Sequence, residues 1–237
     1  MLSIKNQKAF TLIEISIVML VIALIMGGIF VGKDIMRSYK LRMVISEVEH
    51  YKTIANIFMD RFDALPGDMG DAFAYWDTNC AADAVSCNGN NNNAIDSTQE
   101  ELMYWRQLFL SEIIEKPYTG TLNGGNIVSG VNIPSSKMAK GSGHWINHNT
   151  IFGRTANYIT FGADEGSSVH EGAIINPAEA YNIDENTDDG KADSGNTMAA
   201  TATGMGATPC VTSATSPSDF VYDREENVCI LHFNLGI

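Results

Sequence analysis

The chain has few basic residues and little proline, and each shortage excludes a class of structure or function. Lys and Arg together number 15 against 28 Asp and Glu, which gives a formal net charge of −13. Nucleic-acid binding requires a basic face, so the composition argues against DNA or RNA as a partner. No proline occurs before Pro66, so proline interrupts no helix ahead of that residue.

The sequence also lacks the common catalytic motifs. It has no Gly-x-Ser-x-Gly elbow, no Walker phosphate loop and no His-Glu-x-x-His. His144 and His148 have the spacing of zinc ligands on a helix, and His170 precedes Glu171, but neighbouring glycines argue against a helix there. We interpret these histidines as surface or core residues, and we predict that the chain is not an enzyme.

One apolar run dominates the N-terminal region. From Phe10 to Gly32 the only charged side chain is Glu14. A helix over these residues is about 34 Å long, enough to cross a hydrocarbon core of ~30 Å. The segment before it carries Lys5 and Lys8 but no acid, which favours a cytoplasmic N-terminus. We therefore expect residues 10–32 to span a membrane.

Glu14 requires an explanation, because a charged side chain in hydrocarbon costs roughly 2.5–3.5 kcal/mol. It lies near the expected start of the helix, where the helix dipole favours an anion. A secretory signal peptide does not fit, because such signals have a shorter apolar core followed by a small-residue cleavage site. Here the small residue Ala9 precedes the run.

Residues 8–14, Lys-Ala-Phe-Thr-Leu-Ile-Glu, and the apolar run after them resemble the class III leader of type IV pilins and type II secretion pseudopilins. The resemblance implies that a prepilin peptidase cleaves between Ala9 and Phe10 and methylates the new amine of Phe10. Ala9 departs from the family pattern, which usually has Gly before the cut. Glu14 would then neutralise the Phe10 amine of a neighbouring subunit and so promote filament assembly.

The same resemblance implies the partners and the location. The partners are other pilin or pseudopilin subunits, the prepilin peptidase and N-methyltransferase, and an inner-membrane assembly platform with its ATPase. The subunit would cross the bacterial inner membrane once and later join a periplasmic pseudopilus or a cell-surface pilus. The sequence leaves the choice between these two filaments open. It also leaves open a minor pilin that acts as an adhesin or binding module, and a membrane-anchored periplasmic hydrolase.

The helical pattern continues beyond the apolar run. Apolar side chains recur every three or four residues at Leu41, Ile45, Val48, Tyr51, Ala55, Phe58 and Phe62. This spacing predicts one helix from about Phe10 to about Asp63, ended by Pro66 and Gly67. The expected organisation is a leader at 1–9, a membrane or filament-core half-helix at 10–32, an amphipathic half-helix at 33–64 and a globular domain at 65–237.

The globular domain is predicted to be mixed. Ser97 and Glu100 form a capping-box pattern, which indicates a helix that continues toward Pro117. Asn176 and Pro177 indicate a shorter helix that ends near residue 184. Short β-prone segments occur at 145–146, 158–161, 220–222 and 228–231. We therefore predict an α+β, pilin-like fold in which the long helix packs on a small antiparallel sheet.

Four cysteines follow the apolar run: Cys80, Cys87, Cys210 and Cys229. An even number in an exported domain suggests disulfides, and sequence proximity favours pairing Cys80 with Cys87 and Cys210 with Cys229. Free thiols remain the alternative. No Cys-x-x-Cys is present to suggest a zinc site.

Oxygen ligands gather between residues 184 and 193. The candidates are Asp184, Asn186, Asp188, Asp189 and Asp193. The first three have the one-three-five spacing of a calcium loop. However, Gly190 comes one position later than in an EF-hand and the closing Glu is missing, so a solvated acidic turn is the alternative. A structural Ca²⁺ is the only cofactor that the sequence suggests.

Overall fold

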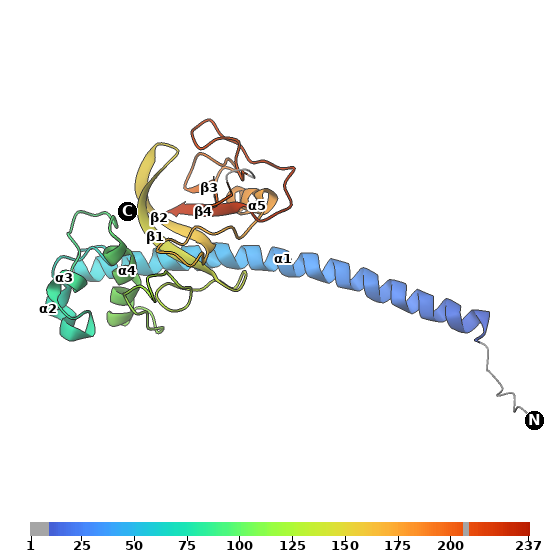
Figure 1. Ribbon diagram of the computed structural model, residues 1–237, viewed down its shortest axis with the longest axis horizontal. Coiled ribbons are helices and arrows are strands. Elements are labelled where there is room, and N and C mark those ends of the chain that lie inside the picture. Colours follow the sequence, from blue (N-terminus) through green and yellow to red (C-terminus); the bar gives the residue numbers. More distant parts are fainter. Residues whose placement is uncertain (1–9, 206–208) are drawn as a thin grey trace, which may run out of the picture. The chain divides into compact units, whose positions relative to one another are not determined.

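The computed structural model describes residues 10–205 and 209–237, and the chain divides into two compact units, residues 1–40 and 41–237. Helix α1 (Leu12–Phe62) is the first element (Figure 1). It confirms the single long helix predicted from the periodic pattern. It ends at Phe62, because Asp63 adopts a positive φ of 53° that cannot continue a right-handed helix. The expected cleavage residue Ala9 lies outside the described residues.

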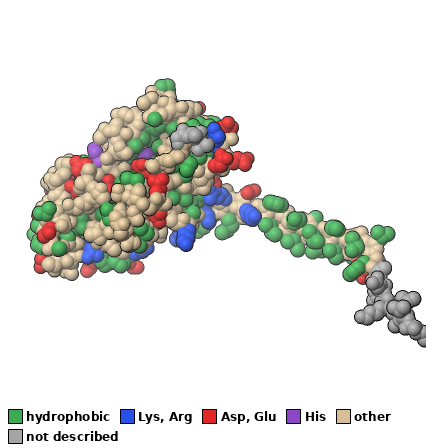
Figure 2. Space-filling model, in the orientation of Figure 1, with side chains coloured by type: hydrophobic (Ala, Val, Ile, Leu, Met, Phe, Trp, Pro, Cys, Tyr) green, Lys and Arg blue, Asp and Glu red, His purple; other side chains and the backbone are tan. Residues whose placement is uncertain are grey.

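The first unit presents an apolar helical surface. The most apolar 18-residue window of α1 has a mean hydropathy of 2.7, and none of it is buried. Figure 2 shows hydrophobic side chains covering this stretch. Glycine lowers helix stability, but Gly27, Gly28 and Gly32 all lie within α1, so the helix continues through them. This part of α1 is long and apolar enough to cross a membrane.

The second unit contains one four-stranded antiparallel sheet. Its strands are β1 (Ser142–Ile151), β2 (Arg154–Ala163), β3 (Thr197–Thr201) and β4 (Cys229–Asn234), in the order β1-β2-β4-β3. This sheet together with α1 confirms the predicted α+β fold. The prediction of a strand at 220–222 was wrong, because only a single bridge forms there, between Val211 and Phe220.

Strands β1 and β2 form a tight hairpin with Ile151 paired to Arg154. The two turn residues, Phe152 and Gly153, have φ values of 46° and 79°. A two-residue turn with both φ values positive matches the right-handed twist of the strands. Gly153 adopts this conformation freely, whereas Phe152 pays a steric cost for it.

In the described part of the second unit, the further helices are α2 (Ala72–Trp76), the 3₁₀ helix η1 (Asp77–Asn79), α3 (Ala84–Cys87), α4 (Thr98–Leu110) and α5 (Pro177–Thr187). Helices α4 and α5 begin at the two predicted capping boxes, with N-caps Ser97 and Asn176. Helix α4 ends before the predicted stop, because Glu112 has a φ of 61°. Helix α5 continues three residues past the predicted end.

The core lies between the C-terminal part of α1, helix α4 and the sheet. From α1, the buried side chains are Val44, Val48, Ile54, Ala55 and Phe58. Figure 1 shows α4 alongside this part of α1, where the rings of Tyr51 and Trp105 meet edge to face with centroids 5.0 Å apart. The amphipathic face of α1 is therefore buried by the globular domain, as its spacing predicts.

Both expected disulfides are present. Cys80 and Cys87 have Cα atoms 5.6 Å apart, and Cys210 and Cys229 have Cα atoms 5.0 Å apart. Cys229 is the first residue of β4, so the second bridge fastens a long loop to the sheet. The sequence separation of 19 makes this bridge worth ~3 kcal/mol in the chain-entropy description.

Candidate functional site

The first candidate site is the N-terminal end of α1. Phe10 is 80% exposed, and the helix begins two residues later. The backbone N and the hydroxyl of Thr11 both donate to Glu14 Oε2 at 2.8 Å. In return the Glu14 N–H donates to Thr11 Oγ1 at 3.3 Å. Thr11 and Glu14 therefore form a reciprocal capping box around the helix start.

This capping box determines where the carboxylate of Glu14 lies. It holds the negative charge in the first turn, where unpaired N–H groups and the helix dipole favour an anion. Our sequence reasoning did not identify Thr11 as the partner of Glu14. The signal was available, because Thr-x-x-Glu before an apolar run is a capping-box pattern.

The second cluster joins α1 to the sheet. The carboxylate of Glu47 accepts a hydrogen bond from Ser136 Oγ at 2.6 Å and from the Lys137 N–H at 3.2 Å, and it lies 2.9 Å from His144 Nε2. Burial favours a higher pKa for Glu47, but the contacts with His144 and Ser136 outweigh it and hold the pKa below its ordinary value. This cluster fixes the register of α1 against β1.

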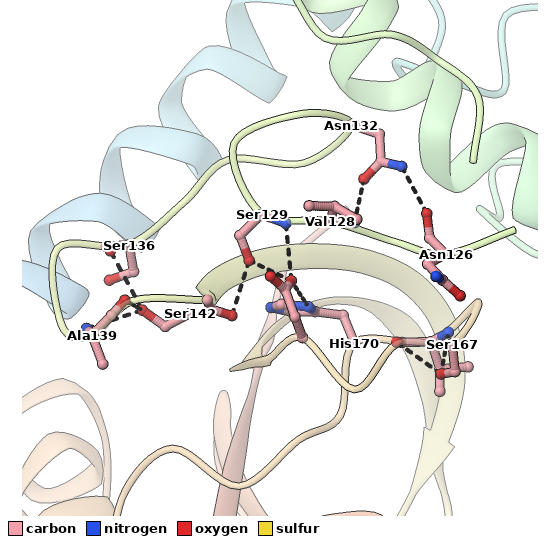
Figure 3. Close-up of polar contacts among 12 residues, drawn as sticks. Asn126, Val128, Ser129, Asn132, Ser136, Ala139, Ser142, Ser167 and His170 are labelled. Atoms are coloured by element: carbon pink, nitrogen blue, oxygen red, sulfur yellow. Dashed lines mark hydrogen bonds and ion pairs between the residues drawn. The ribbon is translucent and has the colours of Figure 1, made fainter. Parts of the chain in front are cut away.

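A third cluster lies beside the start of β1. Ser129 Oγ donates to Asp164 Oδ1 at 2.6 Å, and His170 Nδ1 lies 3.2 Å from the same oxygen. Figure 3 shows Ser129 and His170 lying close together. The pKa of His170 falls to about 4, mainly because the ring is buried. An activated serine nucleophile donates its hydroxyl proton to an imidazole, whereas Ser129 donates to the carboxylate of Asp164. This cluster therefore does not have the arrangement of a catalytic triad.

The remaining histidine of the predicted set also has a polar partner. His148 Nδ1 lies 3.1 Å from Asn157 Oδ1. Both His144 and His148 belong to β1 instead of a helix, as the flanking glycines indicate. Among the residues that the structure describes, the group spaced to hold a metal ion is acidic and contains no histidine.

That acidic group lies at the C-terminal end of α5. Carboxylate oxygens of Asp184, Asp188 and Asp189 all lie within 4.8 Å of one another. Asp188 accepts hydrogen bonds from the backbone N–H groups of Asn196 and Thr197. These bonds tie the end of α5 to the start of β3, so the carboxylates meet on a turn that the backbone itself holds in place.

Asp184 has the most unusual environment of the three. The residue is fully buried, and neither carboxylate oxygen has a hydrogen-bond partner. Burial and then the nearby charges of Asp189 and Asp188 raise its pKa to about 8. Burial disfavours the ionised form of a carboxyl group, so Asp184 holds its proton more tightly than an exposed aspartate.

The structure brings together three of the five predicted calcium ligands. Asn186 and Asp193 turn elsewhere: Asn186 Nδ2 donates to the carbonyl of Asn182 at 2.6 Å, and Asp193 Oδ2 accepts from the Ser218 N–H at 2.9 Å. The one-three-five spacing assumes a loop, but Asp184 and Asn186 both lie within α5. On a helix, residues two apart point in different directions, which separates these two side chains.

Comparison with known families gives one match. Residues 4–30 match the prokaryotic N-terminal methylation motif, which is the signature of type IV pilins and pseudopilins. The match covers the predicted cleavage site, Phe10, Glu14 and most of the apolar run. No curated protein and no solved structure matches the chain. The motif implies processing by prepilin peptidase and assembly with other pilins, and with the long apolar helix it fits a membrane-anchored pilin.

Proposed function

We propose that this chain is a structural subunit of a type IV pilus or a type II secretion pseudopilus. One observation carries the proposal: the residues that match the methylation motif include the exposed apolar start of α1, where Glu14 is the one charge between Phe10 and Gly32. An α+β domain follows the helix, which suits a filament with a helical core and globular domains outside it.

In this function, cleavage between Ala9 and Phe10 creates a new α-amine, which is then methylated. Glu14 lies four residues further along, in the first turn of α1. Pairing Glu14 of one subunit with the Phe10 amine of the next therefore requires the two subunits to be offset along the filament axis. The assembly platform and its ATPase would supply the work of drawing each subunit out of the membrane.

Mass spectrometry of the N-terminus tests the processing step. The chain is co-expressed with a prepilin peptidase and purified, with the same strain lacking the peptidase as the control. We expect a chain that begins at N-methylated Phe10 only when the peptidase is present. An intact Met1 in both strains, or a cut beyond Gly28, would contradict the proposal. An Ala9→Gly variant should be cleaved at least as fast as the natural chain, because Gly is the usual residue of the motif.

We also propose that Asp184, Asp188 and Asp189 hold a structural Ca²⁺. Three observations support it: the carboxylates converge, the Asp184 oxygens have no hydrogen-bond partner, and the negative end of the α5 dipole favours a cation. A bound Ca²⁺ would neutralise the cluster and fix the turn between α5 and β3. Calorimetric titration of the full chain with Ca²⁺, and with Mg²⁺ for comparison, tests the site. The absence of a Ca²⁺ binding heat, or its persistence in Asp184→Asn, would contradict it.

A further inference from the structure

A groove with a basic rim lies on α1 immediately after the apolar run. It is a shallow, open depression lined by Ile29, Gly32, Lys33, Met36, Arg37 and Lys40. The three basic residues follow a spacing of four and then three residues, which places them on one face of the helix. This segment belongs to the first unit of the chain.

The floor of the groove is apolar and open. Ile29 is 52% exposed and Met36 is 58% exposed. Between them, Gly32 has no side chain, and a Cβ built at Gly32 would meet no atom within 4 Å. The groove therefore combines an apolar surface with the ammonium and guanidinium groups of Lys33, Arg37 and Lys40 at its edge.

The position of the groove along α1 suggests what it binds. From Leu12 to Gly32 the helix rises about 30 Å, which matches the hydrocarbon thickness of a bilayer. The two turns that begin at Lys33 would then lie among the headgroups. Long basic side chains at the end of a membrane helix extend toward phosphate groups, while their methylene stems cover apolar surface.

We propose that this groove binds the headgroup of an anionic glycerophospholipid, in the leaflet at the C-terminal end of the apolar run. The proposal rests on the membrane span of the proposed function. The phosphate pairs with Lys33, Arg37 and Lys40, and the first methylenes of an acyl chain lie on Ile29 and Met36. An acidic neighbouring subunit is the competing partner, but such a partner does not account for the apolar floor.

Lipid retention by the full-length chain tests this site. The chain is purified in mild detergent with equal amounts of phosphatidylglycerol and phosphatidylcholine of the same acyl chains, and the retained lipid is measured by native mass spectrometry. We expect the natural chain to retain phosphatidylglycerol preferentially. Replacing Lys33, Arg37 and Lys40 by Gln should lower this preference about fivefold per removed charge.

Two further variants separate a groove from general charge attraction. The triple variant Lys137→Gln, Lys140→Gln, Lys191→Gln removes the same charge from exposed positions in the second unit and should retain the preference. Gly32→Phe fills the floor and keeps every charge, and it should lower phosphatidylglycerol retention. Circular dichroism verifies that α1 remains helical in each variant.

Several results would overturn the proposal. These are equal retention of the two lipids by the natural chain, an unchanged preference after the three groove substitutions or after Gly32→Phe, and an equal loss in the control variant. Self-association that the groove substitutions abolish while lipid retention stays constant would assign the groove to a second copy of the chain. This measurement needs no filament machinery, so its failure and a failure of N-terminal processing are separate results.

Discussion

The buried carboxylate of Asp184 leads to a prediction with an unusual sign: Asp184→Asn should stabilise the calcium-free protein. In the folded chain the pKa of Asp184 is about 8, compared with an ordinary value of 3.8. A raised carboxyl pKa means that the folded state binds the proton more tightly than the unfolded state. The stabilising contribution of Asp184 is therefore fully present below about pH 4 and is lost as the pH rises toward 8.

The size of the effect follows from the two pKa values. Each step of one in pKa corresponds to 1.36 kcal/mol. At pH 7 the folded chain keeps Asp184 mostly protonated while the unfolded chain ionises it, and this difference lowers the free energy of unfolding by roughly 4 kcal/mol. Asn has the shape of the protonated acid and cannot ionise. The variant should therefore equal the natural chain near pH 4 and exceed it in free energy of unfolding by up to roughly 4 kcal/mol at pH 7.

Calcium should reverse the order. A cation bound by the three carboxylates stabilises the natural chain through mass action, whereas the Asn variant has lost a ligand and gains less. Urea unfolding of the full chain in detergent can be followed by fluorescence, because all three tryptophans, Trp76, Trp105 and Trp145, lie in the second unit. The series runs from pH 4 to pH 8, with either EGTA or Ca²⁺.

Glu185→Gln provides the matched control, since it removes one charge from an exposed position on the same helix. Burial raises the pKa of Glu101 to about 8 as well, but this contribution cancels in the difference between two variants that both keep Glu101. A natural chain that is more stable than Asp184→Asn at pH 8 in EGTA would refute the reasoning. A difference that does not grow with pH would refute it equally.

Three other predictions concern assembly and stability. Glu14→Ala should insert into membranes but enter filaments poorly, as measured by the yield of sheared filaments. Thr11→Ala removes the capping side chain and keeps the carboxylate, so it should give more filaments than Glu14→Ala. Equal filament yields from the two variants would contradict the proposed pairing role of Glu14. Replacing Cys210 and Cys229 by Ser should lower the free energy of unfolding, measured by urea titration, by ~3 kcal/mol. An unchanged free energy of unfolding would show that other contacts order the loop. Glu47→Gln should lower the free energy of unfolding by about 1–3 kcal/mol at neutral pH. The natural chain should lose the stabilising contribution of Glu47 as the pH falls through its depressed pKa, and the variant should not show this loss. An unchanged dependence of stability on acidic pH in the variant would contradict that assignment.

Local signals made a large part of the fold predictable. Helix α1 follows from an uninterrupted apolar pattern without proline, and the starts of α4 and α5 follow from capping boxes that are complete within four residues. The disulfides follow from short separations in sequence. Each of these features depends on residues that are neighbours in the chain, so no knowledge of tertiary contacts was needed.

The features that were missed depend on contacts distant in sequence. Strand β3 has the sequence Thr-Met-Ala-Ala-Thr, which has little β propensity, and its pairing with β4 determines its structure. Glu47 and His144 are 97 positions apart, so their contact has no local signature. The local composition indicated the acidic cluster but not its members. Asp184 lies on helix α5 and not in a loop, and this determines which carboxylates converge.

The capping box at the start of α1 has a consequence for the energy of pairing. A cationic amine that pairs with Glu14 would compete with the hydrogen bonds from Thr11, so the loss of those bonds would offset part of the ion-pair energy. Incorporation would then depend on the difference between the new ion pair and the hydrogen bonds it replaces.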